Sequence, residues 1–158
     1  MFVWRKYIII ASVSLSLTFL VSACNDSKTA QCERLIKVVN KGTELIVNNK
    51  GQQVTTSLKL AQDLEAVTKE IKDLKLKDSK LKEFQNRFVD LFETVSLSIS
   101  KAATALNSAK TAKASLEGRL TIQKARGDIE TALTAATNAA KQSDALASQV
   151  NKHCSTPE

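Results

Sequence analysis

Apolar and small side chains recur every three or four residues along most of this chain, and that spacing limits its fold more than any other feature. The longest such run contains Leu81, Phe84, Phe88, Leu91, Val95, Ser98, Ala102, Ala105, Ala109 and Ala112. A mean spacing near 3.5 residues puts these side chains in one stripe along a helix, as in packed bundles and coiled coils. With a single Pro and four scattered Gly, the chain also lacks the turn residues of a β protein. The sequence therefore predicts an all-α fold.

Three further runs with the same spacing predict an antiparallel, up-down four-helix bundle. The first run contains Cys32, Leu35, Val39, Gly42, Ile46 and Asn49, and its helix is expected to end near Gly51. The second run contains Ser57, Leu60, Leu64, Val67, Ile71 and Leu74, with Thr55 or Thr56 as the capping residue. The last run contains Ile122, Ala125, Ile129, Ala132, Ala136, Ala139, Ser143, Leu146 and Val150. The bundle is expected to span residues 32–154, followed by a short tail at 155–158.

Two signals place a turn between the third and fourth helices, which are expected to pair as a coiled-coil-like hairpin. Ser115 is a good N-cap residue and a nearby Gly weakens the helix, so the break is predicted within residues 113–118. Because no Pro interrupts residues 81–150, one continuous helix stays an alternative. Asp78 or Ser79 is predicted to cap the third helix.

A turn centred within this break would set large side chains of the third helix against small ones of the fourth. Phe84 and Phe88 would then face Ala139 and Ser143, as a well-packed core requires. In the distal half of the hairpin the third helix presents Ala102, Ala105, Ala109 and Ala112. That half is expected to bury little apolar area and to be the most mobile part of the hairpin.

The first 24 residues have the order of charge, apolar run and small residues that marks an export signal. Arg5 and Lys6 precede an apolar run from Ile8 to Val21, and the segment closes with Val21-Ser22-Ala23-Cys24. This close resembles the lipobox of bacterial lipoproteins, in which an aliphatic residue and two small residues precede the acceptor cysteine. The resemblance implies a cleaved signal peptide at 1–23, a diacylglyceryl thioether on Cys24, and a lipidated tether over residues 24–31.

The same resemblance implies a location: the bacterial cell envelope, lipid-anchored on the periplasmic side. In lipoproteins an Asp after the acceptor cysteine is associated with retention in the inner membrane, and Asn25 here slightly favours the outer membrane. An uncleaved membrane span is the alternative, but it needs about 20 apolar residues. The run here is shorter and contains Ser12, Ser14, Ser16 and Thr18. The helical part looks like uncharacterised small lipoproteins, some of them cyanobacterial, and this likeness adds no mechanism.

Two cysteines remain once Cys24 carries lipid, and they are predicted to pair. In an up-down bundle the two chain ends lie at the same end of the molecule only when the number of helices is even. Four helices bring Cys32 and Cys154 together, within the range of about 4.4–6.8 Å between Cα atoms that a disulfide requires, whereas three would separate them. An exported compartment is oxidising. We therefore expect a disulfide between Cys32 and Cys154.

Composition excludes several classes of function. Without the signal peptide, the chain has no Trp or Tyr and a single His, His153. Platforms that stack single-stranded nucleic acid depend on aromatic residues, and a structural zinc site needs four ligands. The Glu-x-x-His pairs of ferritin-like bundles are missing, as is a base for a Ser or Thr nucleophile. We therefore expect no enzyme activity, no metal, no cofactor and no nucleic-acid partner.

Basic residues outnumber acidic ones by 23 to 16, and much of the excess falls in one stretch. Between residues 101 and 126 the basic residues are Lys101, Lys110, Lys113, Arg119, Lys124 and Arg126, against Glu117 alone. Helix parity places most of this cluster at the far tip of the bundle, away from the anchoring membrane. Contact with an anionic envelope component is one interpretation of the cluster, and a solvated tip is the other.

Together these features predict a lipid-anchored envelope protein that acts as a structural or interaction module without catalysis. Two alternatives stay open. One is a bundle that carries an apolar ligand, which needs a cavity, and the other is an accessory subunit of a membrane protein complex. A homodimer whose hairpins pair with one another is also compatible with the sequence.

Overall fold

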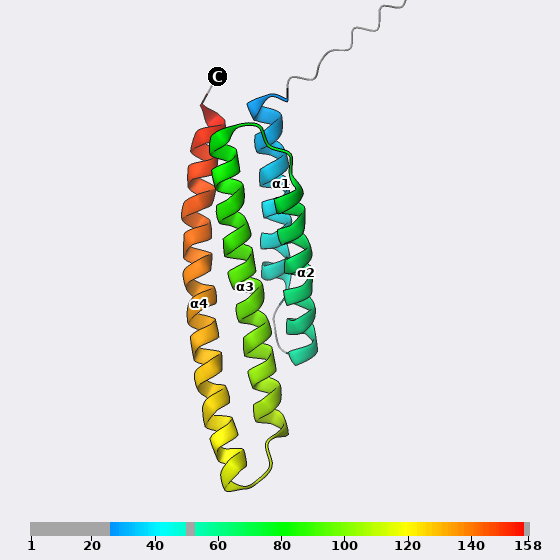
Figure 1. Cartoon of the computed structure of the whole chain (residues 1–158), viewed down its shortest axis with the longest axis vertical. Helices are drawn as coiled ribbons and strands as arrows, with labels where there is room; N and C mark the ends of the chain where they lie inside the picture. Colours follow the sequence, from blue (N-terminus) through cyan, green and yellow to red (C-terminus); the bar gives the residue numbers. More distant parts are fainter. Residues whose placement is uncertain (1–25, 50–52, 157–158) are drawn as a thin grey trace, which may run out of the picture.

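A computed structural model describes residues 26–49 and 53–156, and within them the chain forms four helices and their connections. The helices are α1 (Lys28–Asn48), α2 (Val54–Asp73), α3 (Ser79–Thr111) and α4 (Leu116–Ser155). They run alternately up and down, so that α1 starts and α4 ends at the same end of the molecule (Figure 1). The predicted all-α, antiparallel four-helix bundle is confirmed. The predicted signal peptide and Cys24 lie outside the described residues.

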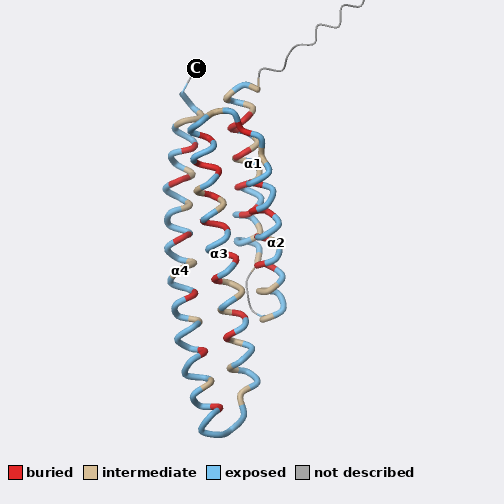
Figure 2. The backbone as a smooth tube through the Cα atoms, viewed as in Figure 1, coloured by how far each residue is buried: buried red, intermediate tan, exposed pale blue. Residues whose placement is uncertain are grey.

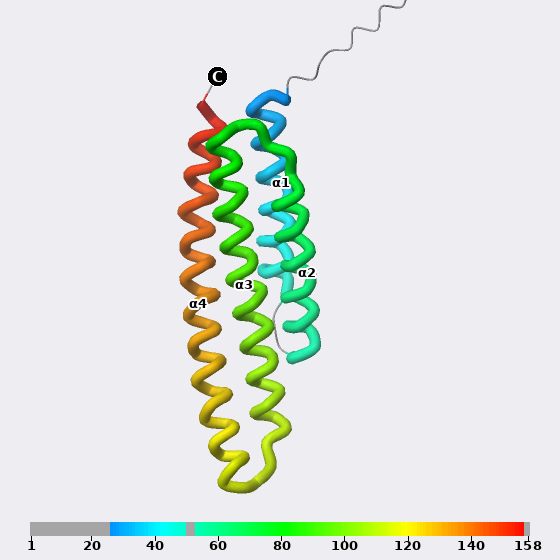
Figure 3. Tube along the Cα trace, in the orientation of Figure 1, coloured from blue at the N-terminus to red at the C-terminus, as the bar shows by residue number. Residues whose placement is uncertain are grey.

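The four helices differ in length, and this divides the molecule into two unlike parts. α1 and α2 have 21 and 20 residues, whereas α3 and α4 have 33 and 40. α3 and α4 therefore continue past the other two helices as a two-helix projection, at the lower end of Figure 3. We call residues 104–132 the arm and the other described residues the body.

Side-chain caps start three of the four helices. The capping residues are Ser27 for α1, Asp78 for α3 and Ser115 for α4, and each accepts a hydrogen bond from the backbone amide three residues later. Such a bond satisfies one of the amides that a helix start leaves without an intrahelical partner. The predicted caps at Asp78 and Ser115 are confirmed, together with the break within residues 113–118.

Three predicted boundaries are wrong at the ends of helices. Residues 28–31 of the expected tether already belong to α1, because the capped turn begins earlier than the apolar stripe. α2 starts at Val54, so Thr55 and Thr56 lie inside its first turn, where the Thr56 hydroxyl donates to the carbonyl three residues earlier (2.9 Å). α4 includes Ser155, the first residue of the expected tail. At the start of α1 the Ser27 cap, rather than the apolar repeat, sets the boundary.

The hydrophobic core lies in the body. The large side chains that are at most 1% exposed there include Leu35, Leu64, Ile71, Leu81, Phe84, Phe88 and Leu146. They come from all four helices and occupy positions of the predicted stripes. In Figure 2 buried positions are dense in the body and sparse along the arm. The buried residues of the arm are all small: Ala105, Gly118, Ala125 and Ala132.

Cys32 in α1 and Cys154 in α4 form a disulfide, with their Cα atoms 5.9 Å apart. The bond joins the first and last helices across a sequence separation of 122. It confirms the predicted pair and the even number of helices from which the pair was inferred. One continuous helix over residues 81–150 is excluded, because the chain reverses direction between α3 and α4.

Hydrogen bonds close the same end of the body. Gln31 is buried, and its side-chain oxygen accepts from the backbone amides of Lys77 and Asp78 in the connection between α2 and α3. Gln85 donates to the carbonyls of Ile71 (2.6 Å) and Leu74 (3.0 Å) at the end of α2. The connection is thus fixed to both α1 and α3. We call this end, with the disulfide, the closed end.

The pairing of α3 with α4 differs from the prediction. Phe84 packs edge-to-face against His153, with ring centroids 5.9 Å apart, instead of facing Ala139 or Ser143. The reason is the connection at residues 112–115, whose first and last residues are extended. α4 therefore begins farther from the body than α3 ends, and its later residues are shifted along α3. The predicted large-against-small pairing is wrong by more than two helical turns.

Candidate functional site

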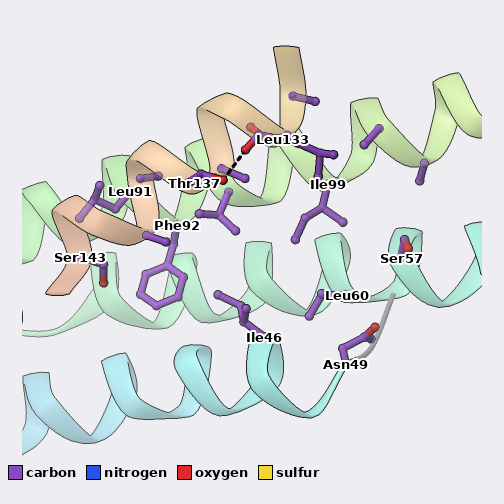
Figure 4. A pocket seen from close by; sticks show the side chains of 18 of the residues that line it. Ile46, Asn49, Ser57, Leu60, Leu91, Phe92, Ile99, Leu133, Thr137 and Ser143 are labelled. Atoms are coloured by element: carbon purple, nitrogen blue, oxygen red, sulfur yellow. Dashed lines mark hydrogen bonds between the residues drawn. The ribbon is translucent and has the colours of Figure 1, made fainter. Parts of the chain in front are cut away.

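An apolar groove lies where the body meets the arm, between the end of α1 and the middle of α4. It has a volume of about 660 Å³ and is open to solvent along one side. All four helices contribute to it, and α3 and α4 supply most of its lining. Figure 4 shows side chains from each helix around this space: Ile46 of α1, Leu60 of α2, Phe92 and Ile99 of α3, and Leu133 of α4.

The lining of the groove is apolar or small almost throughout. α3 contributes Val95, Ile99, Ala102, Ala103 and Leu106. α4 contributes Ile129, Leu133, Ala136, Ala139 and Ala140. Among the described residues that line the groove, Asp144 alone is charged. A concave site of several hundred Å³ with such a lining is typical of the places where proteins hold small apolar ligands.

The groove exists because α1 ends early. α1 stops at Asn48, whereas the apolar stripe of α3 continues beyond that level to Leu106, and the stripe of α4 runs beside it. Beyond the end of α1, only the first turns of α2, with Ser57 and Leu60, lie beside these stripes, and one side of the groove stays open. As a result Val47 is 72% exposed and Leu133 is 58% exposed. Exposed apolar surface that gathers in one place, rather than scattered single residues, indicates a binding surface.

The register of α3 against α4 fixes the length of the groove. The Arg87 guanidinium of α3 donates to the Gln149 side chain of α4 (3.0 Å), so these two residues lie at the same level. Counting along both helices from this pair puts Phe92 and Asp144 at one end of the groove, and Leu106 and Ile129 at the other. At a rise of 1.5 Å per residue the groove is about 21 Å long. We call the Phe92 end proximal and the Leu106 end distal.

Phe92 closes the proximal end of the groove. Its ring lies against Gly42 of α1, and a Cβ atom at that position would collide with the ring. The glycine therefore lets α1 approach α3 closely, and the ring is 4% exposed. A side chain at position 42 would force Phe92 or α1 to shift.

The five basic residues that the sequence singled out lie on the arm, and all are exposed. They are Lys110 in α3, Lys113 in the connection, and Arg119, Lys124 and Arg126 in α4. Lys124 forms an ion pair with Asp128 (2.8 Å) on the same helix. All five thus lie on the arm, and of these Lys110 and Arg126 lie within about one turn of the residues that line the groove.

At the closed end the side chains of Asp78 and His153 are in contact. His153 Nε2 lies 3.3 Å from Asp78 Oδ1. Burial raises the pKa of the Asp78 carboxyl, but the hydrogen bond from the Leu81 amide and the attraction of His153 outweigh burial and hold this pKa below its usual value. Within residues 26–49 and 53–156 no group of three His, Cys, Asp or Glu side chains is arranged to hold a metal ion.

Residues 1–25, with the predicted lipid acceptor Cys24, are not among those described, so their assignment stays a prediction. In the described part of the chain, no helix is both long enough and apolar enough to cross a membrane.

Sequence reasoning missed the groove, although the sequence held a signal for it. The first apolar run was expected to end near Gly51, whereas the third continues to Ala112. Two helices of such unequal length cannot cover one another over their full extent. The surplus of the longer helix had to be either solvated or a site, and its apolar side chains favour a site.

Comparison with known proteins gives no relative: no protein-family model, no curated protein and no solved structure matches the chain. The function is therefore inferred from the chain's own residues.

Proposed function

We propose that the protein is a lipid-anchored, non-catalytic binding module of the bacterial cell envelope, and that its ligand is apolar and occupies the groove. The groove is the observation that supports this proposal. It combines a volume of about 660 Å³ with an apolar lining, and Asp144 is the one charged residue among the described residues of that lining. Ligand sites in helical bundles are built between helices in this way. Of the functions that the sequence leaves open, a carrier of an apolar ligand therefore fits best.

The proposed anchor fits the arrangement of the closed end. Cys24 precedes Asp26 by two residues, which span at most about 7 Å when extended. The start of α1 would thus lie next to the membrane, with the arm directed away from it. The disulfide between Cys32 and Cys154 supports an oxidising compartment such as the periplasm. Asn25 favours the outer over the inner membrane.

The anchor is tested by Cys24→Ala. This variant should accumulate as an unprocessed precursor without lipid, because the acceptor thiol is gone. The matched control is the double variant Cys32→Ser with Cys154→Ser, which keeps Cys24 and should be processed normally. Intact mass and partition into detergent report the outcome. If Cys24→Ala protein still has the mature mass and still extracts with detergent, the anchor assignment is wrong.

The groove is tested by filling it. Ala136 lines the groove and is partly buried, whereas Asn138 is exposed on the same helix and does not line it. Ala136→Phe should therefore fill the site, and Asn138→Phe adds the same side chain elsewhere. The probe is methyl hexadecanoate with a photoreactive diazirine on its last carbon, added to full-length protein in phosphatidylcholine vesicles.

This probe should crosslink to peptides of α3 and α4 that line the groove. Labelling should fall strongly in Ala136→Phe and persist in Asn138→Phe, while circular dichroism shows that both variants remain helical. Equal labelling of the two variants, or labelling that avoids the groove, would contradict the proposed function.

A further inference from the structure

The two ends of the groove differ in charge. At the proximal end Asp144 is part of the lining. At the distal end the lining stops at Leu106 and Ile129, and a basic residue follows each within about one turn. Lys110 comes four residues after Leu106 in α3, and Arg126 comes three residues before Ile129 in α4. The groove is therefore apolar along its length, acidic at one end and basic at the other.

Lys110 and Arg126 lie on the groove faces of their helices. Lys110 is seven residues from Ala103 and Arg126 is seven residues from Leu133, which is about two turns in each case. Residues two turns apart share a helix face, and both Ala103 and Leu133 line the groove. The hydrogen bond between Arg87 of α3 and Gln149 of α4 sets the register of the two helices, and this register puts Lys110 level with Arg126.

Two cations thus flank the distal mouth of the groove, one on each helix. In the described part of the chain neither Lys110 nor Arg126 makes an ion pair, whereas the neighbouring Lys124 is paired with Asp128. Glu130, one turn after Arg126 on the same side of α4, offsets part of this charge. The mouth retains a net positive charge that an anionic group would neutralise.

The dimensions of the groove fit one hydrocarbon chain. A volume of about 660 Å³ spread over a length of about 21 Å leaves a cross-section of roughly 30 Å². A helix with its side chains is about 10 Å wide, or roughly 80 Å² in section, so a partner helix would rest on the rim. An extended alkyl chain advances about 1.25 Å per carbon, as expected from C–C bonds near 1.5 Å in a zigzag. About 16 carbons therefore fill the length.

We propose that the ligand is a free fatty acid of about 16 carbons, with its tail end against Phe92 and its carboxylate between Lys110 and Arg126. This inference rests on the proposed function and adds the chemistry and the direction of the ligand. The opposite direction would bring the carboxylate next to Asp144, and like charges at close range repel. A second copy of the chain is disfavoured as the occupant, because its helices are too wide to enter the groove and would rest on its rim.

The experiment uses full-length protein in phosphatidylcholine vesicles at low ionic strength, with hexadecanoic acid and its methyl ester as paired probes. Each probe is made in two forms, with a photoreactive diazirine on the last carbon or on the third carbon. The acid should label peptides near Phe92 from its last carbon, and peptides near Leu106 and Ile129 from its third carbon. The ester has the same chain without the charge, and therefore lacks the preference for one direction.

The double variant Lys110→Gln with Arg126→Gln should lower labelling by the acid about tenfold at subsaturating probe, as expected for the loss of two partly exposed charge contacts. Labelling by the ester should not change. The matched control, Lys101→Gln with Lys141→Gln, removes one exposed lysine from each of the same helices outside the groove lining, and should leave both probes unaffected.

Three outcomes would overturn the fatty-acid inference and leave the proposed function standing. They are equal labelling by acid and ester with no effect of the double variant, a reversed order of the two diazirine positions, and crosslinks between two copies that replace probe labelling as protein density rises. A groove labelled by neither probe overturns both proposals.

Discussion

The body and the arm share one helical repeat but are held together by different forces. In the body the facing positions are large, and Leu81, Phe84 and Phe88 are at most 1% exposed. In the arm the buried positions are Ala and Gly, such as Ala125 and Gly118. Burial stabilises by about 25 cal/mol per Å² of apolar surface, so Leu and Phe contribute far more than Ala. The repeat shows where helices face one another, and the residues at its positions decide how firmly they are held.

Intrinsic helix propensity replaces packing in the arm. Ala has the highest propensity of all residues, and α3 and α4 are rich in Ala where they leave the body. The cap at Ser115 secures the start of α4. Parts of a protein with few buried apolar contacts open most readily, and ligand sites are commonly found next to such parts. The groove lies at the border between the firm body and the loose arm.

Truncating a large side chain in each part gives the strongest contrast. Phe88→Ala should lower the free energy of unfolding by about 3–5 kcal/mol, because a fully buried ring leaves a cavity. Ile122→Ala in the arm should cost less than about 1 kcal/mol, because that side chain is 47% exposed. Urea unfolding followed by circular dichroism measures both. Losses of similar size would show that the arm is packed as firmly as the body.

Removing the disulfide should weaken the body next in order of effect. Cys32→Ser with Cys154→Ser should cost about 2–5 kcal/mol, since the bond restricts a long loop of the unfolded chain. The melting temperature should fall while the helical circular dichroism signal persists. Thiol titration of the parent protein without reductant is the control and should find no free thiol. An unchanged melting temperature would mean that hydrogen bonds alone hold the closed end.

Two glycines of α4, one next to the turn of the arm and one farther along the helix, should respond in opposite ways to substitution by Ala. At Gly118 a Cβ atom would collide with the Lys113 carbonyl, so Gly118→Ala should lower the free energy of unfolding by roughly 1–2 kcal/mol. At Gly127 a Cβ atom meets nothing within 4 Å, so Gly127→Ala should raise it by about 0.5–1 kcal/mol. Thermal melting shows the opposite signs. A loss in both variants would mean that the arm is more crowded than described.

The smallest predicted effect is a loss of folding stability at acid pH, caused by Asp78 at the closed end. The pKa of Asp78 is lower in the folded protein than its ordinary value of 3.8, so folding is favoured while this carboxyl is ionised. The stabilisation is present at neutral pH and is lost as the pH falls below about 4. Asp78→Asn keeps a capping side chain but cannot ionise, so its melting temperature should fall less between pH 6 and pH 3. If the melting temperature falls equally with pH in both proteins, ionisation of Asp78 beside His153 does not stabilise the fold.

Local chemistry predicted much of the fold. The apolar runs gave the four helices and their buried faces, Asp78 and Ser115 gave two of the helix starts, and the parity of an up-down bundle gave the disulfide. Each of these predictions depends on residues close in sequence or on the topological rule for an up-down bundle. The pairing of Phe84 was not predictable in this way, because a few extended residues in the connection shift α4 along α3 by more than two turns.

The groove was not predicted, because its signal in the sequence is the unequal length of the first and third apolar runs rather than a motif of neighbouring residues. It depends on where α1 ends relative to α3 and α4, which only the assembled bundle shows. The basic residues were found as a cluster at the tip, yet their relation to an apolar site required the register of the two helices. Lys110 and Arg126 are 16 positions apart in the sequence and come level with each other only through that register.

Hydrogen–deuterium exchange of the full-length protein in vesicles, with and without hexadecanoic acid, tests the central contrast most directly. Without ligand, amides of the body in α2 and the first half of α3 should exchange slowly, and those of the arm should exchange much faster. Ligand should slow exchange selectively in residues 99–106 and 126–136, on the two sides of the distal groove. Uniform protection along α3 and α4, unchanged by ligand, would contradict both the division into body and arm and the groove as a binding site.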